Sequence, residues 1–596
     1  MSLLGCMMAV QAAAQTALAP IAPLPSKHQV AWQQMETYAF IHFGPNTFGN
    51  REWGYGDAPL ESFNPTRLDC EQWAKTLHDA GMKGIIITAK HHDGFCLWPT
   101  KYTDYSVRNT PYKNGKGDIV GELSAACKKY GLKFGVYLSP WDRHQAFYGT
   151  PLYVEYFYAQ LEELLTQYGD IFEIWFDGAN GGDGYYGGAR EERTIDRTYY
   201  NFPRAWKMVE RLQPQAIIFS DGGPGCRWVG NEKGYAHATN WSFLRGNEVY
   251  PGYSRYWELQ QGHADGDTWT PAECDVSIRP GWFYHESEDS KVKTVDYLTD
   301  LYYRSVGHNA TFLLNMPVDK EGRIHPIDSA RVVDFHKRIC AEFKTDLLAK
   351  AKIKASNVRG KQWGTANLTD GNYETYWSIS DGTDKAQLTI TLPRNTRLNR
   401  LMLQEYIPLG QRVQRFSVSY LKGKEWAPLS VGEETTTVGY KRLLRFATIE
   451  TRQIRISFDA MRGPICLSTV AAYLAPETKG AEEKKEEVKG VDFTATAEGD
   501  NVVTFDLGGE QEIGSLRYLP QQGDDRKGLV ANYEIYAGME KDAMQRVAEG
   551  EFSNIRNNPV MQEVFFTPTH CRYVQLHATR MVNAGEKIAY QQVIIR

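Results

Sequence analysis

The hydrophobic positions between residues 28 and 345 follow two alternating patterns. Short runs that are apolar throughout are followed by longer stretches in which apolar residues recur every three or four positions. The first pattern predicts strands buried on both faces of a parallel sheet, and the second predicts amphipathic helices. The predicted strands are 38–43, 84–90, 133–139, 171–176, 216–221 and 311–315, and the predicted helices are 70–80, 119–130, 154–168, 202–212 and 329–344.

The strand-then-helix order predicts a distorted (β/α)8 barrel of the TIM type over residues 27–346. No Gly-rich phosphate-binding loop follows the first predicted strand, which disfavours a doubly wound nucleotide-binding fold. A chain of 596 residues is too long for one hydrophobic core, so two to four domains are expected.

Beyond residue 350 the pattern changes to short runs that alternate between apolar and polar residues, as in 386–392 and 415–420. Such runs are typical of antiparallel β-sandwiches. Residues 477–490 are charged and lack aromatic side chains, which predicts a linker or an exposed hairpin. We therefore expect two sandwich domains, at 347–476 and 491–596.

Composition narrows the function class and the compartment. The net charge is −5 with both signs mixed, which argues against a nucleic-acid or polyanionic partner. Residues 1–15 resemble the end of a secretory signal, so residues 1–26 are expected to be a leader and extension of a periplasmic or secreted protein. No later segment is apolar for long enough to span a membrane. The nine cysteines form no C-x-x-C pair, and apart from Cys6 we expect buried thiols.

Polar and aromatic residues follow the predicted strands at their carboxyl ends. In an α/β barrel these ends form the mouth of the active site, so the side chains are expected to converge there. Imidazoles, carboxylates, a guanidinium and indoles together suit a ligand with many hydroxyl groups. The set is His42, Glu52, Trp53, His91, His92, Asp93, Tyr137, Trp141, Asp142, Asp177, Asp221, Arg279 and Trp282.

These residues also have structural interpretations. Asp177 can cap a helix that follows its strand. Glu52 can be a solvated loop acid, and Trp53 and Trp282 can be ordinary packing residues. The adjacent histidines after the second strand can bind a metal, but neighbours at a strand end point to opposite sides and no third ligand is suitably spaced. We therefore expect no metal in the catalytic site and no cofactor.

Cleavage of a glycosidic bond needs two carboxyl groups, one that attacks the anomeric carbon or activates water and one that protonates the departing oxygen. Asp177 ends a buried strand and precedes glycines, which suits the nucleophile. Glu232 lies on a loop rich in glycine and aromatic residues, where Trp228 can desolvate it and raise its pKa, which suits the acid/base. The separation that distinguishes a retaining enzyme (~5–5.5 Å) from an inverting one (~6.5–9.5 Å) does not follow from the sequence.

Several motifs within residues 28–345 together resemble the α-L-fucosidases of glycoside hydrolase family 29. The matching pieces are His42–Gly44, Glu52–Trp53, Ala89–Phe95, Gly135–Ser139, Ile174–Gly178 and Thr311–Pro317. The resemblance implies a retaining mechanism with Asp177 as the nucleophile. It also implies a fucose pocket formed by His42, Glu52, Trp53, His91, His92 and Tyr137.

Residues 227–234 and 277–285 resemble the subgroup of this family that prefers α-1,3- and α-1,4-linked fucose on branched glycans. This assignment implies that Glu232 is the acid/base. The position of that residue varies across the family, so Glu273 and Glu286 remain alternatives.

The two C-terminal blocks resemble discoidin-like (coagulation factor type C) sandwiches, the fold of many carbohydrate-binding modules. Residues 355–357 and 368–377 carry the resemblance in the first block, and residues 533–536, 552–559 and 572–574 carry it in the second. Modules of this kind often bind a structural calcium ion, for which Asp370 is a candidate ligand. Sugar binding and a scaffold role are both open for these modules.

Taken together, the sequence favours a retaining exo-α-L-fucosidase that acts on fucosylated glycans without a cofactor. Two alternatives remain open: an exo-glycosidase for another sugar of similar shape, and a catalytically silent glycan-binding protein whose sandwiches are the working part. The presence of both carboxyl groups argues against the second alternative.

Overall fold

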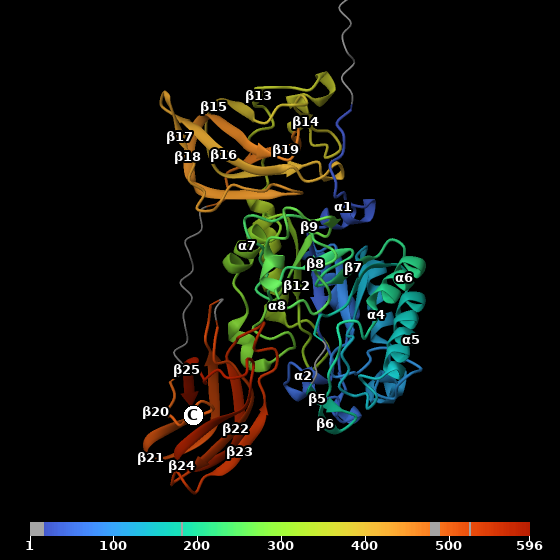
Figure 1. Ribbon diagram of the computed structural model, residues 1–596, viewed down its shortest axis with the longest axis vertical. Coiled ribbons are helices and arrows are strands. Elements are labelled where there is room, and N and C mark those ends of the chain that lie inside the picture. The colour runs from blue at the N-terminus through green and yellow to red at the C-terminus, as the bar shows by residue number, and fades with distance from the viewer. Residues whose placement is uncertain (1–16, 180–182, 477–488, 524–525) are drawn as a thin grey trace, which may run out of the picture.

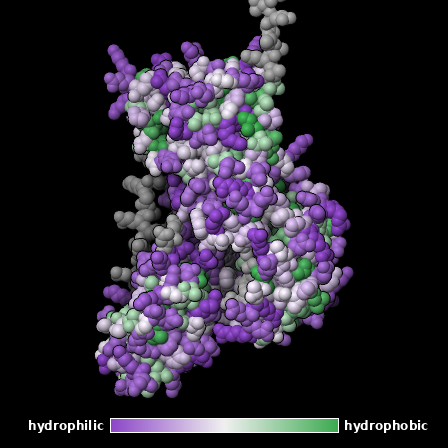
Figure 2. All heavy atoms as spheres, viewed as in Figure 1, coloured by the Kyte–Doolittle hydropathy of each residue, from purple (hydrophilic) through white to green (hydrophobic). Residues whose placement is uncertain are grey.

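The computed structural model describes residues 17–179, 183–476, 489–523 and 526–596. Most of the predicted leader and most of the predicted linker at 477–490 lie outside these ranges. Within them, no helix combines the length and the apolar character needed to cross a membrane. The face shown in Figure 2 is largely hydrophilic, with hydrophobic residues scattered among polar ones.

Eight parallel strands close into a barrel, which confirms the predicted fold class. Around the barrel the order is β1 (Thr37–Ile41), β2 (Gly84–Lys90), β3 (Lys133–Leu138), β4 (Ile171–Trp175), β7 (Ile217–Ser220), β8 (Cys226–Trp228), β11 (Ala272–Ser277) and β12 (Ala310–Asn315). The long helices around it (Figure 1) are α3 (Cys70–Asp79), α4 (Ile119–Tyr130), α5 (Pro151–Gln167), α6 (Phe202–Leu212), α7 (Val295–Arg304) and α8 (Pro326–Glu342).

The barrel is distorted where the sequence pattern did not reveal its strands. β8 has only three residues and follows β7 without an intervening helix, so it is too short to show a period. β11 carries Glu273 and Asp275, whose charges disguise a strand in which all six residues are buried. The short elements α1 (Lys27–Gln33), α2 (Pro45–Gly49), the hairpin β5 (Asp183–Tyr186) and β6 (Ala189–Glu192), and the pair β9 (Phe243–Leu244) and β10 (Thr268–Trp269) complete this region.

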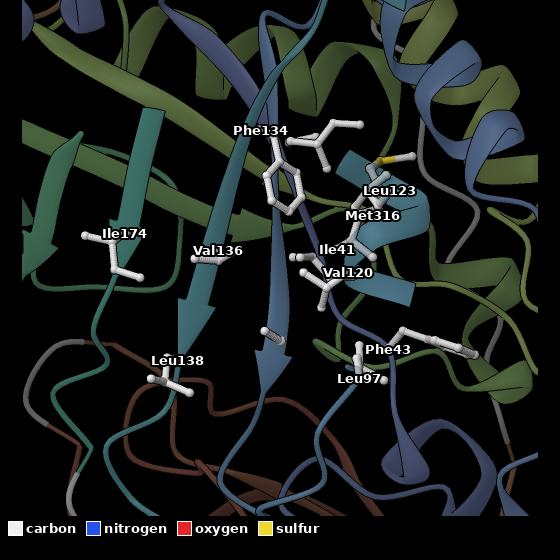
Figure 3. Packing of buried hydrophobic residues seen from close by; sticks show 14 of the residues in the cluster. Ile41, Phe43, Leu97, Val120, Leu123, Phe134, Val136, Leu138, Ile174 and Met316 are labelled. Carbon is white, nitrogen blue, oxygen red and sulfur yellow. The ribbon is translucent and has the colours of Figure 1, made fainter. Parts of the chain in front are cut away.

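Alternate residues of the strands serve two different cores. In β1, Ala39 and Ile41 pack outward against the helices, while Tyr38 and Phe40 point into the barrel, as the two-residue period of a strand requires. The outer layer is aliphatic around Ile41, Val136 and Ile174 (Figure 3). The inner layer is aromatic, and the rings of Trp175 and Phe219 stack with centroids 3.7 Å apart.

Two antiparallel sandwiches follow the barrel, as expected from the alternating pattern. The second domain contains β13 (Lys352–Ala355), β14 (Trp377–Ser378), β15 (Ala386–Glu405), β16 (Val413–Lys422), β17 (Glu425–Pro428), β18 (Arg442–Met461) and β19 (Cys466–Tyr473). The third domain contains β20 (Thr494–Ala497), β21 (Val502–Pro520), β22 (Val530–Gly538), β23 (Gln545–Glu551), β24 (Gln562–Met581) and β25 (Tyr590–Ile595). Each domain has a hydrophobic core of its own.

The cysteines differ in one respect from expectation. The eight described cysteines are free, and seven of them are buried, but Cys340 is exposed. It lies near the end of α8, on a part of the helix that faces away from the barrel core. The prediction of buried thiols is therefore wrong for this residue.

The sandwiches occupy opposite ends of the barrel (Figure 1). The second domain meets the amino-terminal ends of the strands, where Lys441 pairs with Glu36 just before β1 and Glu433 pairs with His308 just before β12 at 2.8 Å. The third domain meets the carboxyl-terminal ends, where Glu551 forms a two-pronged ion pair with Arg143 at 2.8 and 3.0 Å. Only the third domain therefore reaches the end at which barrel enzymes place their active sites.

The Arg143–Glu551 pair makes the interface sensitive to charge, because the Arg143 side chain is 1% exposed and that of Glu551 is 11% exposed. Glu551→Gln keeps the shape but leaves a buried guanidinium without its counter-ion, at an expected cost of ~3–5 kcal/mol. We predict a lower thermal-unfolding midpoint, measured by calorimetry at constant pH. Glu549→Gln is the matched control, because exposed Glu549 pairs with Arg546 at the surface, where such a pair is worth at most about 1 kcal/mol. Equal midpoints for the two variants would contradict this prediction.

Candidate active site

A cavity of about 260 Å³ opens at the carboxyl ends of the barrel strands. Its wall combines aromatic rings, three histidines and several carboxyl groups. The lining residues of the barrel domain include Phe40, His42, Trp53, His91, His92, Tyr137, Trp175, Asp177, Asp221, Trp228, Glu232, Tyr253, Tyr256, Asp275 and Trp282. The third domain adds Asn554, Arg556 and Asn557.

Asp177 follows β4 and faces this cavity with a quarter of its side chain exposed. The Tyr137 hydroxyl donates to Oδ2 at 3.0 Å, and the backbone N–H of Ala179 donates to Oδ1 at 2.7 Å. Burial raises the pKa of Asp177 to about 6, although these two hydrogen bonds lower it. In the described residues no helix begins between Asp177 and α6 at Phe202, so the helix-capping interpretation of Asp177 is wrong.

Steric crowding explains why a glycine follows Asp177. A Cβ atom at Gly178 would overlap the carboxylate of Asp221, the residue that follows β7. Asp221 in turn accepts a hydrogen bond from the backbone N–H of Gly252 at 2.7 Å, and burial raises its pKa to about 7. The strand end at Asp177 is thus packed tightly against its neighbour.

Glu232 lies on the loop after β8, in the wall of the same cavity. The indole N–H of Trp282 donates to Oε2 at 2.6 Å, and the amide of Asn554 donates to Oε1 at 3.0 Å and to Oε2 at 2.8 Å. Burial raises the pKa of Glu232 to about 8, with a contribution from the negative charge of Asp177. At neutral pH Asp177 is therefore ionised and Glu232 protonated, which is the pairing that acid-assisted displacement needs.

The three cavity histidines are neutral. Burial lowers the pKa of His42 to about 4 and holds the pKa values of His91 and His92 well below their usual range. Ser139 donates its hydroxyl proton to the Trp141 carbonyl at 2.7 Å, so its oxygen accepts from His92 Nδ1 at 2.7 Å. His92 Nε2 then carries a lone pair, 3.7 Å from the Asp177 carboxylate.

His42 is fixed in the same way. Asn315 donates its amide protons to Ser277 and Trp282, so its oxygen accepts from His42 Nδ1 at 2.9 Å. His42 Nε2 is left as an acceptor. His91 Nδ1 is buried and has no hydrogen-bond partner within the described ranges. The Nε2 atoms of His42 and His92 can therefore accept hydrogen bonds from the hydroxyl groups of a ligand.

Of the predicted binding residues, four lie behind the cavity wall rather than in it. The Glu52 carboxylate accepts from the backbone N–H groups of Trp282 and Phe283, at 2.8 and 3.2 Å, and from His285 Nε2 at 2.7 Å. It therefore shapes the loop that presents Trp282. Trp141 packs against the rings of Trp53 and His92, with centroids 5.3 and 4.9 Å away.

The other two predicted binding residues, Asp142 and Arg279, form buried ion pairs. Asp142 is fully buried and lies 3.2 Å from the Lys90 ammonium. Arg279 is also fully buried and donates to Asp328 at 2.8 and 3.0 Å and to Asp289 at 2.8 Å. Neither Asp142 nor Arg279 lines the cavity, and the same holds for Glu52 and Trp141. Direct contact of these four residues with a ligand stays a prediction.

The two alternatives to Glu232 are placed away from the cavity wall. Glu273 points into the barrel, where it accepts hydrogen bonds from Trp175 Nε1 at 2.7 Å and from the Tyr38 hydroxyl. Glu286 is exposed at the start of a short 3₁₀ helix, Glu286–Lys291. The geometry thus favours Glu232 among the three.

Sequence reasoning missed two kinds of cavity residue. Asp275 and Trp175 lie on strands and face inward, and the polar i, i+2 pattern of Glu273, Asp275 and Ser277 was a usable signal for β11. Asn554 gave no signal, because it lies 322 residues from Glu232 in another domain. Only the tertiary structure brings it to the site.

Metal binding finds little support in the described residues. Three side chains there have ligand atoms within 4.8 Å of one another, namely Glu173, Cys226 and Glu273. Trp32 and Trp175 donate indole N–H groups to these carboxyls at 2.7 Å each, and Tyr38 donates its hydroxyl. The carboxyl oxygens already have donors that a cation would have to displace.

The predicted calcium ligand Asp370 lies on an exposed loop of the second domain. Its oxygens accept from the backbone N–H of Asn372 at 2.8 Å and from the Thr375 hydroxyl at 2.6 Å. Within the described ranges Asp370 belongs to no group of three or more His, Cys, Asp or Glu side chains with ligand atoms close together. Calcium binding at Asp370 stays a prediction.

Comparisons with known proteins agree with this geometry. Residues 21–337 match the family model described as Alpha-L-fucosidase, and residues 352–469 match the F5/8 type C domain. Alpha-L-fucosidase 1 of Arabidopsis thaliana is 42% identical over 467 residues, which cover 76% of this chain and 88% of the relative.

Two solved structures extend the match. A glycoside hydrolase 29 family member from an unknown rumen bacterium is 41% identical with a TM-score of 0.70, and the match covers 97% of this chain and all of that one. A Ruminococcus gnavus GH29 fucosidase, an aspartate-to-alanine variant in complex with fucose, is 36% identical with a TM-score of 0.69 over 78% of this chain and 97% of its own. This chain therefore belongs to the α-L-fucosidases of glycoside hydrolase family 29, with a coagulation factor type C domain after its catalytic barrel.

Proposed function

We propose that this protein is a retaining exo-α-L-fucosidase that removes terminal α-1,3- or α-1,4-linked fucose from glycans. The observation that carries the proposal is the pair of carboxyl groups in one cavity, where burial raises the pKa of Asp177 to about 6 and that of Glu232 to about 8. A double displacement needs this combination of an ionised nucleophile and a protonated acid.

In the first step a carboxylate oxygen of Asp177 attacks the anomeric carbon, while Glu232 gives its proton to the glycosidic oxygen. The carbon–oxygen bond to the leaving sugar breaks, and a fucosyl ester on Asp177 forms. In the second step the Glu232 carboxylate removes a proton from water, and the water oxygen attacks the same carbon. Asp177 leaves as a carboxylate, and Glu232 regains its proton.

The neutral histidines suit the recognition of sugar hydroxyls. His42 and His92 each present a lone pair on Nε2, and His91 has an unpartnered Nδ1. Trp53 and Trp282 supply apolar surface for the methyl group and the ring face of fucose. The Ruminococcus gnavus relative, a variant in complex with fucose, supports fucose as the sugar that this family binds.

We also propose that the protein is secreted or periplasmic. This rests on the resemblance of residues 1–15 to the end of a signal peptide, which lies outside the described residues.

The nucleophile assignment is tested by Asp177→Ala. We expect turnover of an aryl α-L-fucoside to fall by ~10⁴-fold or more, because the covalent step is lost. Fucose binding, measured by calorimetry, should persist, because the histidine and tryptophan contacts remain. Asp196→Ala is a suitable control, since Asp196 is exposed on the surface. Near-normal turnover by Asp177→Ala would remove the central assignment.

The two carboxyl groups predict a bell-shaped dependence of kcat/KM on pH. Below about pH 6 Asp177 becomes protonated and loses its nucleophilicity, and above about pH 8 Glu232 loses the proton that it must donate. Activity should therefore fall in both directions from the interval between these values. Glu232→Gln should lose the alkaline limb in its residual activity on an activated substrate. An unchanged alkaline limb in that variant would assign the limb to another group.

Linkage preference is tested by release of fucose from a Lewis-type trisaccharide compared with 2-linked fucosyl lactose. We expect the Lewis-type trisaccharide to have the higher kcat/KM, since residues 227–234 and 277–285, which include Glu232 and Trp282, carry the subgroup resemblance. Faster cleavage of the 2-linked glycan would overturn the linkage proposal and leave the α-L-fucosidase assignment intact. An aryl galactoside in the same panel checks the preference for the fucose methyl group.

A further inference from the structure

We infer that the third domain is a working part of the active site, in which Asn554 is the positioning residue for the acid/base. The inference rests on the proposed role of Glu232 and adds a second domain to the catalytic apparatus. It assigns the loop 552–558 two tasks: to orient the Glu232 carboxyl and to line the space occupied by the leaving sugar.

The hydrogen bonds around Glu232 determine which oxygen can carry the transferable proton. Trp282 and Asn554 both donate to Oε2, at 2.6 and 2.8 Å, whereas Oε1 receives only the longer contact of 3.0 Å from Asn554. An oxygen that accepts two hydrogen bonds is occupied as an acceptor, so the proton of the neutral carboxyl resides on Oε1. Asn554 therefore helps to fix the orientation of the acid.

The loop that carries Asn554 is held rigidly by its own domain. Phe552 and Ile555 are buried in the core of the third domain, 4% and 2% exposed. Asn554 has a left-handed backbone with φ of 57°, and its carbonyl accepts from the N–H groups of Asn557 and Asn558 at 3.1 and 2.8 Å. Because the turn is closed by these hydrogen bonds, the backbone of Asn554 is fixed and its side-chain amide is pre-organised next to Glu232.

Contacts on three sides dock the loop on the barrel. Glu551 pairs with Arg143 of the β3–α5 connection at 2.8 Å. The Asn558 amide donates to the carbonyl of Pro280 at 2.8 Å, two residues before Trp282, and Arg556 donates to the Tyr256 hydroxyl at 2.9 Å. These contacts hold the loop on the barrel, so the position of Asn554 depends on the docked domain.

The same loop lines the cavity beside the acid. A general acid protonates the oxygen that joins the cleaved sugar to the rest of the glycan, so groups around the acid face the leaving sugar. Arg556 and Asn557 line the cavity together with Asn554 and Tyr256. Their donors and acceptors suit the hydroxyl groups of a sugar, which assigns the leaving-group subsite in part to the third domain.

The test compares substrates that differ in their need for a proton. α-L-Fucosyl fluoride has a good leaving group, whereas a Lewis-type trisaccharide releases a sugar alcohol and depends on acid catalysis. Asn554→Gly removes the amide and keeps the left-handed backbone accessible. We expect kcat/KM, which reports the first step, to fall ~10²-fold on the trisaccharide, the lower end of what general acid catalysis contributes. On the fluoride kcat/KM should change less than about threefold.

A second variant tests the pKa of Glu232, which would not change if Asn554 only stabilised the fold. Asn554→Asp also tolerates the left-handed backbone but places a second carboxylate beside Glu232, which raises the pKa of that acid. The alkaline limb of kcat/KM should therefore move to higher pH. Asn583→Gly is the matched control, because Asn583 donates to Glu586 within the third domain at 3.2 Å, and its profile should match the parent protein.

Glu232→Ala in the same series separates the two levels of the argument. If Glu232→Ala lowers kcat/KM on the trisaccharide far more than on the fluoride, the acid/base assignment stands. Equal losses on both substrates for Asn554→Gly, or no loss on either, would then overturn the role of Asn554 alone. If Glu232→Ala lowers kcat/KM, which reports the first step, alike on both substrates, the proposed function itself fails, and this inference fails with it.

Discussion

Desolvation of carboxyl groups at the mouth of the barrel is the constraint on which the rest of the site depends. Removing water from a carboxyl group disfavours its ionised form and raises its pKa, unless hydrogen-bond donors of the protein replace the water. Asp177 receives two donors and Glu232 receives two as well, yet burial leaves their pKa values at about 6 and about 8. The negative charge of Asp177 is among the causes that raise the pKa of Glu232, so the two acids are coupled through the cavity. Their division of roles is thus a property of the environment that they share.

The floor of this cavity is set from within the barrel. Trp175 lines the cavity, stacks on Phe219 and donates its indole N–H to Glu273 at 2.7 Å. Glu273 lies against Glu173, and burial raises the pKa of both, so a proton shared between them avoids two adjacent buried charges. The aromatic layer and this pair of acids fix the floor of the cavity, and the proposed catalytic residues Asp177 and Glu232 lie in its walls.

The two sandwiches divide their tasks by the end of the barrel on which they lie. The second domain covers the amino-terminal ends of the strands and also holds residues 17–26, where Ile21 donates to Leu409 at 3.1 Å and Arg412 donates to Ala19 at 2.6 Å. In α/β barrels this end contributes to stability and the opposite end contributes to catalysis. The third domain lies at the catalytic end, with Asn554 in contact with an acid of the cavity. One architecture thus serves a scaffold role at one end and a role in the site at the other.

Local pattern by itself determined the barrel, most of its strands and its nucleophile candidate. Strands such as Gly84–Lys90 and helices such as Ile119–Tyr130 agree to the residue, because burial on both faces or on one stripe leaves a direct trace in the order of apolar residues. Asp177 was visible because a rigid buried strand ends beside it. Whether a polar residue at a strand end reaches the cavity was decided only by the tertiary structure. Four predicted binding residues have their partners behind the cavity wall, namely Glu52, Trp141, Asp142 and Arg279. Asn554, in another domain and 322 residues from Glu232 in the sequence, donates to that acid. Apolar periodicity is a local property of the chain, whereas hydrogen bonds and ion pairs are satisfied by whichever partners folding brings near, and these carry no trace in local sequence order.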